Sequence, residues 1–417
     1  MTKKIKKLHR YYWYLLAIFI ALLIIGMENV FSATFASDRQ FGSPYSHFYK
    51  QILYTGLGFV LAAFCYCKDY HLWRKRIVWE TAGAIVLLIV VLCVGTVVNG
   101  SRRWISLGFF SFQPSELAKL ASILYASHWI SKSLEQHKEI EFLHCLSTKK
   151  KAAFWQKIPV VPHMALVAPS IMAFFVIIQP DAGTAIVIFV IPVIMLLVSG
   201  AHILKVKIPL LLLMIGGVAV LCYEPYRLSR ILIWWNPWQD AQNAGYQTIQ
   251  GLIAIGTGHI IGQGIGTGVS KFGSLPEAHT DFAFAVFAQE WGLCGTVLII
   301  TLFFAFMRVG FLTAMYCKDT FGSLLALGLT LYLGGQGFIN IAMVSNVLPV
   351  VGVPLPFISY GGTSLIVNMI AMAILLNISR QNYRNAEKER MQYSIPPLQS
   401  LKEEPVRSQF PQNLENK

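Results

Sequence analysis

Residues 80–98 read ETAGAIVLLIVVLCVGTVV, a stretch in which Glu80 is the only charged side chain. About 20 consecutive apolar residues are what an α-helix needs to cross the hydrocarbon core of a bilayer. Nine further apolar stretches of similar length lie at residues 12–33, 50–67, 114–131, 162–180, 183–200, 207–224, 282–307, 322–345 and 362–380. The sequence therefore predicts an all-α integral membrane protein with ten transmembrane helices.

Composition supports a membrane protein over a soluble one. Hydrophobic residues make up 55% of the 417 residues and charged residues only 13%, against about 25% charged in soluble domains. The net charge of +14 is spread over short runs between apolar stretches, so it forms no single basic face for nucleic acid. The seven cysteines show no C-x-x-C pair, which argues against a disulfide framework or a zinc site.

The distribution of Lys and Arg predicts the orientation. With the N-terminus inside, the inside segments hold 26 Lys and Arg residues and the outside segments hold seven. Because basic residues favour the cytoplasmic side, both termini are expected in the cytoplasm. The outside then carries one long segment, residues 225–281, between helices seven and eight. Residues 1–380 are expected to form the membrane domain, and residues 381–417 a disordered cytoplasmic tail.

A basic and acidic cluster surrounds the start of the fourth helix. Arg102 and Arg103 precede Pro114, which suits the first turn of a helix. Glu116 and Lys119 are three residues apart and can pair on one helix face. Two interpretations stay open here, an internal ion pair with interfacial arginines, or an anion site that uses Arg102, Arg103 and Lys119.

Two outside segments have structural explanations as well as functional ones. Asp181 follows Gln179-Pro180 in a tight turn, where it could simply cap the next helix. Six glycines between Gly256 and Gly268 could form an anion-binding nest of amides or a flexible re-entrant connection.

Acidic residues are concentrated where the long outer segment meets helix eight. Glu277, His279 and Asp281 lie within five residues, and Asp281 stands at the outer mouth of the helix. An N-cap is one explanation for Asp281, and a carboxylate with a raised pKa beside an apolar surface is the other. Glu290 lies about 13 Å further along at 1.5 Å per residue, where an unpaired charge would be costly.

A proline-rich and glycine-rich segment, residues 349–364, interrupts helical structure before helix ten. It includes Ser359 and Tyr360. Non-helical backbone at membrane depth is tolerated only where it is buried in protein or lines a cavity.

These motifs, in this order, resemble the SEDS family (shape, elongation, division and sporulation) of bacterial cell-wall synthases, over about residues 12–380. The resemblance rests on residues 102–104, 113–119, 179–181, 245–247, 275–282 and 356–362, and it is most like the cell-division member. Two positions depart from the family pattern. Gln289 stands where many relatives have Glu, and Thr363 stands where Ser is usual.

The resemblance implies a ten-helix peptidoglycan glycosyltransferase of the bacterial cytoplasmic membrane. Such an enzyme polymerises lipid II at the outer face in cell division, with other division proteins and a class B penicillin-binding transpeptidase as partners. Asp281 corresponds to the family's essential residue and proposed catalytic base. The remaining substrate-binding candidates are Arg102, Arg103, Glu116, Lys119, Lys271, Glu277, His279, Ser359 and Tyr360.

The implied chemistry needs few groups. Pyrophosphate on a polyprenyl carrier leaves readily, so one base for the acceptor hydroxyl can suffice in an inverting single displacement. Cations would stabilise the departing charge, and a divalent ion such as Mg²⁺ or Mn²⁺ could share that work. No other cofactor is expected.

Alternative functions are a lipid II flippase, a secondary transporter and a structural scaffold. A flippase has no need of a base at the outer mouth, and a transporter would be expected to show inverted repeats. We expect the transpeptidase to dock on helices eight and nine, where Gly334, Gly335, Gly337 and Ala342 offer close packing.

Overall fold

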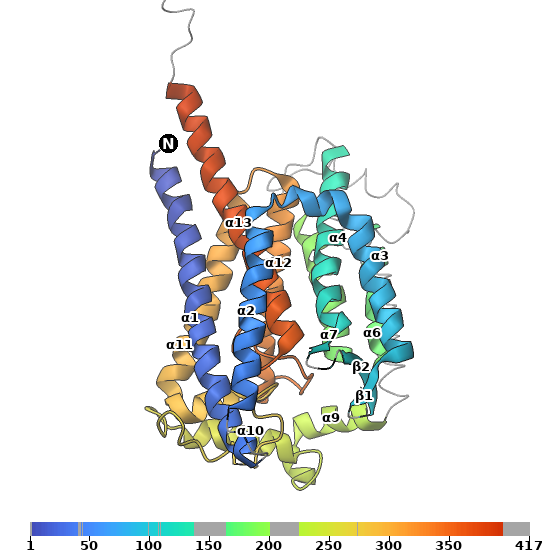
Figure 1. The fold of residues 1–417 in the computed structure, drawn as a ribbon, viewed down its shortest axis with the longest axis vertical. Helices are drawn as coiled ribbons and strands as arrows, with labels where there is room; N and C mark the ends of the chain where they lie inside the picture. The colour runs from blue at the N-terminus through green and yellow to red at the C-terminus, as the bar shows by residue number, and fades with distance from the viewer. Residues whose placement is uncertain are drawn as a thin grey trace, which may run out of the picture.

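A computed structural model gives the fold, and it describes residues 2–40, 43, 45–98, 100–106, 108, 110–136, 164–200, 225–272 and 274–394. Figure 1 shows a bundle of long helices with shorter elements gathered at the end opposite the N-terminus. The helices are α1 (Thr2–Gln40), α2 (Ser46–Cys67), α3 (His71–Val94), α4 (Pro114–Gln136), α6 (Met164–Ile178), α7 (Ala182–Val198), α9 (Pro225–Trp235), the 3₁₀ turn η1 (Pro237–Asp240), α10 (Tyr246–Thr257), α11 (Ala283–Tyr316), α12 (Thr320–Val344) and α13 (Gly362–Ser394).

The all-α, multi-span membrane architecture is confirmed. Six described helices, α1, α2, α3, α11, α12 and α13, are long and apolar enough to cross a bilayer, and α6 and α7 are shorter apolar helices. The more polar α4 matches the expected fourth span, and the seventh, residues 207–224, lies outside the described residues. Ten spans, and the orientation, therefore stay predictions.

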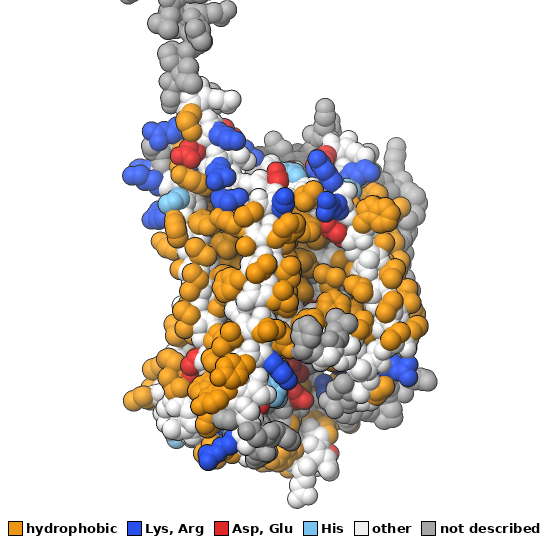
Figure 2. All heavy atoms as spheres, in the orientation of Figure 1, with side chains coloured by type: hydrophobic (Ala, Val, Ile, Leu, Met, Phe, Trp, Pro, Cys, Tyr) orange, Lys and Arg blue, Asp and Glu red, His pale blue; other side chains and the backbone are white. Residues whose placement is uncertain are grey.

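Charge and apolar surface are separated along the bundle. Figure 2 shows a wide hydrophobic band around the middle of the molecule, with Lys and Arg side chains gathered at the end that carries the N-terminus. This is the distribution that the charge bias of the sequence predicts for a cytoplasmic end.

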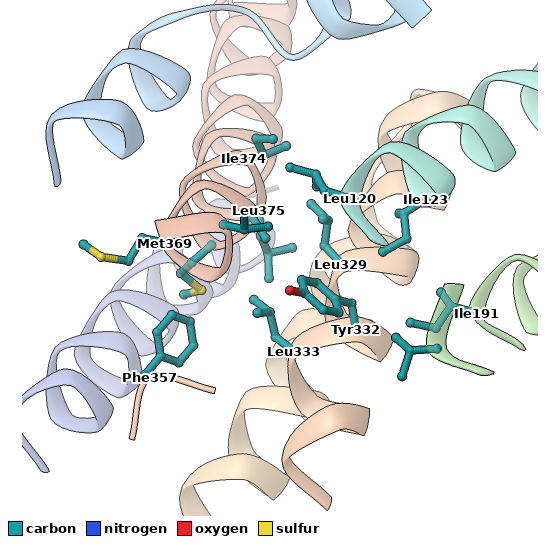
Figure 3. Packing of buried hydrophobic residues seen from close by; sticks show 14 of the residues in the cluster. Leu120, Ile123, Ile191, Leu329, Tyr332, Leu333, Phe357, Met369, Ile374 and Leu375 are labelled. Carbon is teal, nitrogen blue, oxygen red and sulfur yellow. The ribbon is translucent and has the colours of Figure 1, made fainter. Parts of the chain in front are cut away.

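The helices pack around α12 and α4. α12 contacts α11, α4 and α13, while α13 lies along α2 and α1. In the core, Tyr332 of α12 lies among Leu329, Leu333 and the α4 residue Leu120 (Figure 3). Its hydroxyl donates a 2.6 Å hydrogen bond to Asn368 of α13, which satisfies a polar group that would be costly in this apolar core.

The expected docking face on helix nine is wrong for two of its glycines. A Cβ atom on Gly334 would lie 2.1 Å from the sulfur of Met307, and one on Gly337 would lie 2.5 Å from the ring of Phe303. Both neighbours belong to α11, so these glycines allow α11 and α12 to pack closely inside the molecule. Only Gly335, of the three, faces open space.

A small sheet follows α3, which the sequence analysis did not predict. Strands β1 (Thr96–Val98), β2 (Ser101–Ser106) and β3 (Ser111–Phe112) pair antiparallel in that order. Their β-branched and aromatic residues suit strands, and Gly100, at φ +76°, lies in the turn between β1 and β2. The helix of the expected third span therefore ends at Val94. Arg102 and Arg103 lie in strand β2 of the sheet.

The last helix also differs from expectation. α13 continues beyond residue 380 to Ser394, so the chain leaves the bundle as a helix rather than as a disordered tail from residue 381. Residues 395–417 lie outside the described part.

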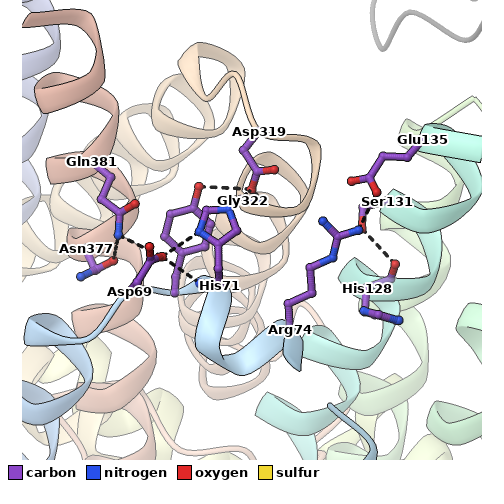
Figure 4. A network of polar contacts seen from close by, with 11 residues as sticks. Asp69, His71, Arg74, His128, Ser131, Glu135, Asp319, Gly322, Asn377 and Gln381 are labelled. Atoms are coloured by element: carbon purple, nitrogen blue, oxygen red, sulfur yellow. Dashed lines mark hydrogen bonds and ion pairs between the residues drawn. The ribbon is translucent and has the colours of Figure 1, made fainter. Parts of the chain in front are cut away.

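Polar contacts tie the helices together at the N-terminal end of the bundle. His71 contacts Asp69 (2.7 Å) and Asp319 (3.3 Å), and Arg74 pairs with Glu135 at 2.6 Å. Figure 4 shows this network joining the α2–α3 connection to α12, α13 and α4. It lies at the opposite end of the bundle from Asp281, which precedes α11.

Candidate functional site

Asp281 lies in a compact turn immediately before α11. Within this turn the amides of Thr280 and Phe282 both donate to the carbonyl of Glu277, at 3.2 and 3.1 Å. Glu277 adopts a φ of +53°, an uncommon conformation for a residue with a side chain. The turn thus holds Asp281 at the mouth of the helix.

Asp281 is not the N-cap that one interpretation proposed. The N-cap position of α11 is Phe282, without a side-chain capping bond. No described group donates a hydrogen bond to the Asp281 carboxylate, which is half-buried. Its carboxylate is therefore not committed to holding the helix.

The electrostatic surroundings make Asp281 a weak acid. Burial, and then the neighbouring carboxylates of Glu277 and Asp181, raise the pKa of Asp281 to about 7. The guanidinium groups of Arg230 and Arg103 oppose this shift. A carboxylate that titrates near neutrality can accept a proton and release it again.

A second loop, residues 345–361, closes over the first. Asn340 of α12 donates from its side-chain amide to the carbonyls of Asp281 (2.8 Å) and Val353 (2.7 Å), so one side chain holds both loops. A Cβ atom on Gly352, whose φ is +71°, would lie 3.3 Å from Oδ2 of Asp281. Gly352 therefore lets the second loop pass close to the carboxylate.

His279 and Tyr360, two of the substrate-binding candidates, lie together, whereas a third, Ser359, has its oxygen engaged by the backbone. The amide of Tyr360 donates to the carbonyl of His279 at 2.8 Å, and their rings are 5.7 Å apart. Burial lowers the pKa of His279, which favours the neutral ring. Ser359 is buried, and its oxygen accepts the amide of Leu355 at 2.9 Å.

A histidine and aspartate pair outside the set of candidate residues lies beside these rings. Asp38, at the end of α1, is buried and accepts hydrogen bonds from the amide of His47 (2.8 Å) and from its ring Nδ1. The His47 ring lies 5.4 Å from that of His279 and 5.0 Å from that of Tyr360. Asp38 and His47 lie more than 230 residues from Asp281 in the sequence, and no sequence motif connects them with the Asp281 turn.

Arg103 is part of the site, whereas Arg102 is turned away from it. Arg103 donates from Nε to the carbonyl of Gln179 at 2.8 Å and from Nη2 to that of Pro180. It thereby joins β2 to the α6–α7 turn, where Asp181 accepts the amide of Thr184 at 3.1 Å as the expected helix cap. The exposed Arg102 donates, among the described groups, only to the carbonyl of Leu92 at 3.4 Å.

Lys119, the third cation of the expected anion site, lies apart from the two arginines. Lys119 is 1% exposed and pairs with Glu116 at 2.8 Å, so the internal ion-pair interpretation is correct for these two residues. Its ammonium group also donates to Gln336 at 2.9 Å. Both charged groups are enclosed by the bundle and do not join the arginines at the outer mouth.

Lys271 is likewise enclosed rather than presented to substrate. Its ammonium group donates to Glu290 at 2.8 Å and to Ser32 at 2.9 Å, and all three residues are buried. The ion pair with Lys271 thus explains why Glu290 is tolerated within the helix. Gln289, the departure from the family pattern, accepts from the amide and hydroxyl of Ser270 and donates to Thr257 at 2.9 Å.

A cavity of about 290 Å³ opens beside the Asp281 turn. Its wall includes Arg230, another residue that the candidate set omitted although it is one of the seven outside basic residues. Arg230 donates to the carbonyl of Val350 at 2.9 Å. The other lining residues are Ile233, Trp234, Asn243, Ala244, Tyr246, Gln247, Thr248, Pro276 and Asn346.

Among the residues that the structure describes, no three His, Cys, Asp or Glu side chains are grouped as ligands would be. Among these residues, the positive groups that act on the Asp281 carboxylate are the guanidinium groups of Arg230 and Arg103.

Comparisons with known proteins agree with this picture. The family model FtsW/RodA/SpoVE, described as "Cell cycle protein", matches residues 12–384. Stage V sporulation protein E of Bacillus subtilis is 36% identical over 370 residues, covering 88% of this chain and 96% of the relative. A probable peptidoglycan glycosyltransferase FtsW of Coxiella burnetii is 36% identical over 367 residues, covering 86% and 94%.

Solved structures share the fold. The chain superposes on a member of a peptidoglycan synthase complex that coordinates polymerization and crosslinking, with a TM-score of 0.67, 26% identity, and 89% and 98% of the two chains covered. The rod shape determining protein RodA of Thermus thermophilus gives a TM-score of 0.59, 25% identity, and 89% and 97% covered. The chain is therefore a multi-pass membrane protein of the FtsW/RodA/SpoVE family, the SEDS family, and within it is FtsW-like.

Proposed function

We propose that this chain is a peptidoglycan glycosyltransferase that polymerises lipid II at the outer face of the cytoplasmic membrane. Asp281 is the base that removes the proton from the acceptor hydroxyl. Relatives named as probable peptidoglycan glycosyltransferases support the general reaction. The observation that carries the proposal is the state of Asp281, a half-buried carboxylate with a pKa near 7 and no hydrogen-bond donor among the described groups.

The geometry supports proton removal by one group. A base works best when its pKa lies near the working pH, because it must accept the proton and still be deprotonated at the start. A hydroxyl of the acceptor sugar placed within about 3 Å of Asp281 would then attack the donor's anomeric carbon. An α-linked donor gives a β-linked product by this single displacement, without a covalent intermediate.

Arginines would stabilise the leaving pyrophosphate. Arg103 uses two of its N–H groups on the carbonyls of Gln179 and Pro180, and a guanidinium group has five. Its remaining donors and its fixed position beside Asp281 suit a phosphate oxygen. The proposed mechanism therefore keeps Arg103, replaces Lys119 and Arg102 with Arg230, and assigns no step to a metal ion.

The partner would be a transpeptidase. The structural relative named above belongs to a complex that coordinates polymerization and crosslinking. The one S-x-x-K sequence in this chain, residues 147–150, lies in a segment that the charge distribution predicts to be cytoplasmic, on the opposite side of the membrane from the wall. We propose that a class B penicillin-binding protein crosslinks the strands that this chain makes. We assign the pair to cell division on the likeness to FtsW.

The test is synthesis from purified components. The protein, in detergent or in lipid nanodiscs, is given labelled lipid II with and without the transpeptidase, and products are separated by length. We expect glycan strands from the wild-type chain and none from Asp281→Asn. Asp240→Asn is the matched control, because Asp240 is an outer-face carboxylate that caps an exposed turn.

A flippase gives the opposite result. It would move labelled lipid II between leaflets of a liposome without forming strands, and Asp281→Asn would leave that movement intact. Strand formation by the Asp281→Asn variant at the wild-type rate would also contradict the proposed role of this residue.

A further inference from the structure

The glycine-rich segment between α10 and the Asp281 turn, residues 258–272, is built into a break in α11. At Gly292 the backbone of α11 is not helical (φ 65°, ψ −160°). The carbonyls of Gln289 and Glu290 accept the amides of Gln263 (3.0 Å) and Gly264 (3.1 Å). The break leaves backbone carbonyls without a partner inside the helix, and amides of the glycine-rich segment donate hydrogen bonds to them.

Backbone amides of α11 also donate hydrogen bonds to the glycine-rich segment. The amides of Leu293 and Cys294, just after the break, donate to the carbonyls of His259 (2.9 Å) and Ile260 (3.1 Å). Four backbone hydrogen bonds therefore connect the segment to α11. Backbone outside a helix can lie at membrane depth only when its polar groups find such partners.

Close approach explains two of the glycines. A Cβ atom on Gly262 would lie 2.1 Å from the carbonyl oxygen of Glu290, and one on Gly258 would lie 2.2 Å from that of Ala288. The segment is thus held against the helix. The two interpretations from the sequence, a flexible connection and an anion nest, do not fit a segment whose amides at 263 and 264 are already used.

Large apolar side chains project from the seated segment. Ile261 is 84% exposed, and the other exposed members are Ile260, Ile265, Val269 and Phe272. We call these five residues the apolar rim. The segment's only Lys, Arg, Asp or Glu is Lys271, and its charge is withdrawn into the buried pair with Glu290.

The apolar rim continues the exposed apolar surface of α11. Leu293, Val297 and Phe304 are exposed apolar residues of that helix, and the carbonyl of Ile260 is bonded one residue beyond Leu293. The part of α11 after the break, residues 293–316, extends about 36 Å at 1.5 Å per residue, enough to cross a hydrocarbon core of about 30 Å. The break therefore lies at the end of the part of α11 that can cross the bilayer, where the exposed apolar surface of the helix begins.

We propose that the apolar rim is a lipid-docking surface that inserts into the outer leaflet of the bilayer. Interfacial insertion of this kind places apolar side chains about 5–10 Å below the headgroup boundary. Only eight residues separate Phe272 from Asp281, so the rim holds the Asp281 turn at the level of the headgroups. This proposal does not depend on the reaction that Asp281 performs.

Spin labels on the rim test the proposal. Single cysteines replace Ile261 or Ile265 in a chain without its native cysteines, reconstituted in nanodiscs of phosphatidylethanolamine and phosphatidylglycerol. Collisions of each label with oxygen, which dissolves in lipid, and with a water-soluble nickel chelate are then measured. Phe304→Cys on α11 is the lipid-facing control, and Gln242→Cys on the exposed outer turn is the aqueous control.

We expect both rim labels to behave like the label at 304, with frequent oxygen collisions and loss of the nickel collisions seen at 242. Nickel collisions at 261 and 265 equal to those at 242 would show that the rim lies in water and would overturn the proposal. Few collisions of either kind would show that protein covers the rim, which would overturn it equally.

A second pair of variants tests the connection to α11. Gly262→Ala places a Cβ atom against Glu290, so it should displace the segment and raise nickel collisions at a label on residue 261. Gly256→Ala is the matched control, because its Cβ atom would meet nothing within 4 Å, and it should leave the label unchanged. An unchanged label in the Gly262→Ala chain would contradict the claim that the helix break seats the rim.

Discussion

Asp281 and Glu290 are nine residues apart, yet the protein treats their carboxylates in opposite ways. Glu290 is 2% exposed and is bound by Lys271 and Ser32. Asp281 is half-buried and receives no hydrogen bond from the described groups. A carboxylate whose acceptor sites are filled is a structural group, whereas one that is enclosed but unpaired is available for proton transfer. The difference separates the scaffold from the proposed chemistry within one stretch of chain.

The largest expected effect concerns the paired carboxylate. Lys271→Met leaves Glu290 buried without its cation, which typically costs about 3–5 kcal/mol of stability. Thermal unfolding in detergent should show a large fall in Tm. Lys318→Met is the control, because Lys318 and Glu389 form an exposed pair and such pairs contribute only about 0–1 kcal/mol.

The double variant Lys271→Met with Glu290→Leu sharpens this test. Removing both charges also removes the uncompensated one, so much of the lost stability should return. If the double variant were no more stable than Lys271→Met alone, the loss would come from packing rather than from the buried charge.

Asp281 should show the reverse pattern, a loss of activity without a loss of stability. Asp281→Asn keeps the size of the side chain and removes the base, so polymerisation should fall on the order of 10²-fold or more. Because the pKa in the folded chain, about 7, exceeds the usual 3.8, ionisation opposes folding at high pH. The Tm of the variant at pH 8 should therefore equal or exceed that of the wild type.

Much of the architecture could be predicted because bilayer thickness constrains helix length. Long apolar runs such as residues 80–98 identified helices, and Pro114 marked the start of α4. The β1–β2–β3 sheet was missed because its strands are two to six residues long and continue the composition of the preceding helix. Local pattern cannot show where a helix stops when both structures favour the same side chains.

The candidate site was predictable in its motif but not in its partners. The spacing of Glu277, His279 and Asp281 indicated one cluster, and the structure places them in one turn. Lys119 and Lys271 were assigned to substrate because a basic residue in an apolar region looks functional. Both instead satisfy a glutamate, and the partner of Lys271 is 19 residues away, a separation that no local periodicity reveals.

The pH dependence of the reaction measures the availability of Asp281 directly. A base must be deprotonated to act, and its pKa is raised to about 7. The rate, kcat/KM, should fall about tenfold for each pH unit below 7 and level off above it. A rate that stays flat down to pH 5 would show that Asp281 either titrates near its usual value or is not the base.

The two adjacent arginines should differ in the same assay. Arg103→Lys loses the planar fork that bonds to Gln179 and Pro180, and a point charge does not replace it. We expect polymerisation to fall by about tenfold, the loss of roughly one charge-assisted hydrogen bond. Arg102→Lys is the matched control, since Arg102 is exposed and makes one long hydrogen bond to the part of the chain that the structure describes. Equal losses in both variants would indicate general interfacial anchoring.

The smallest expected effect distinguishes two similar pairs at opposite ends of the bundle. Asp38 accepts from the amide and ring Nδ1 of His47, and Asp69 does the same for His71. Losing such a cap costs about 1 kcal/mol, so Asp38→Ala and Asp69→Ala should lower Tm by similar small amounts. Only the Asp38 pair contacts the ring of His279, two residues from Asp281. Asp38→Ala should therefore reduce kcat a few-fold, because displacing a reacting group even slightly slows the step, while Asp69→Ala leaves kcat unchanged. The same kcat in both variants would make Asp38 and His47 a helix cap and nothing more.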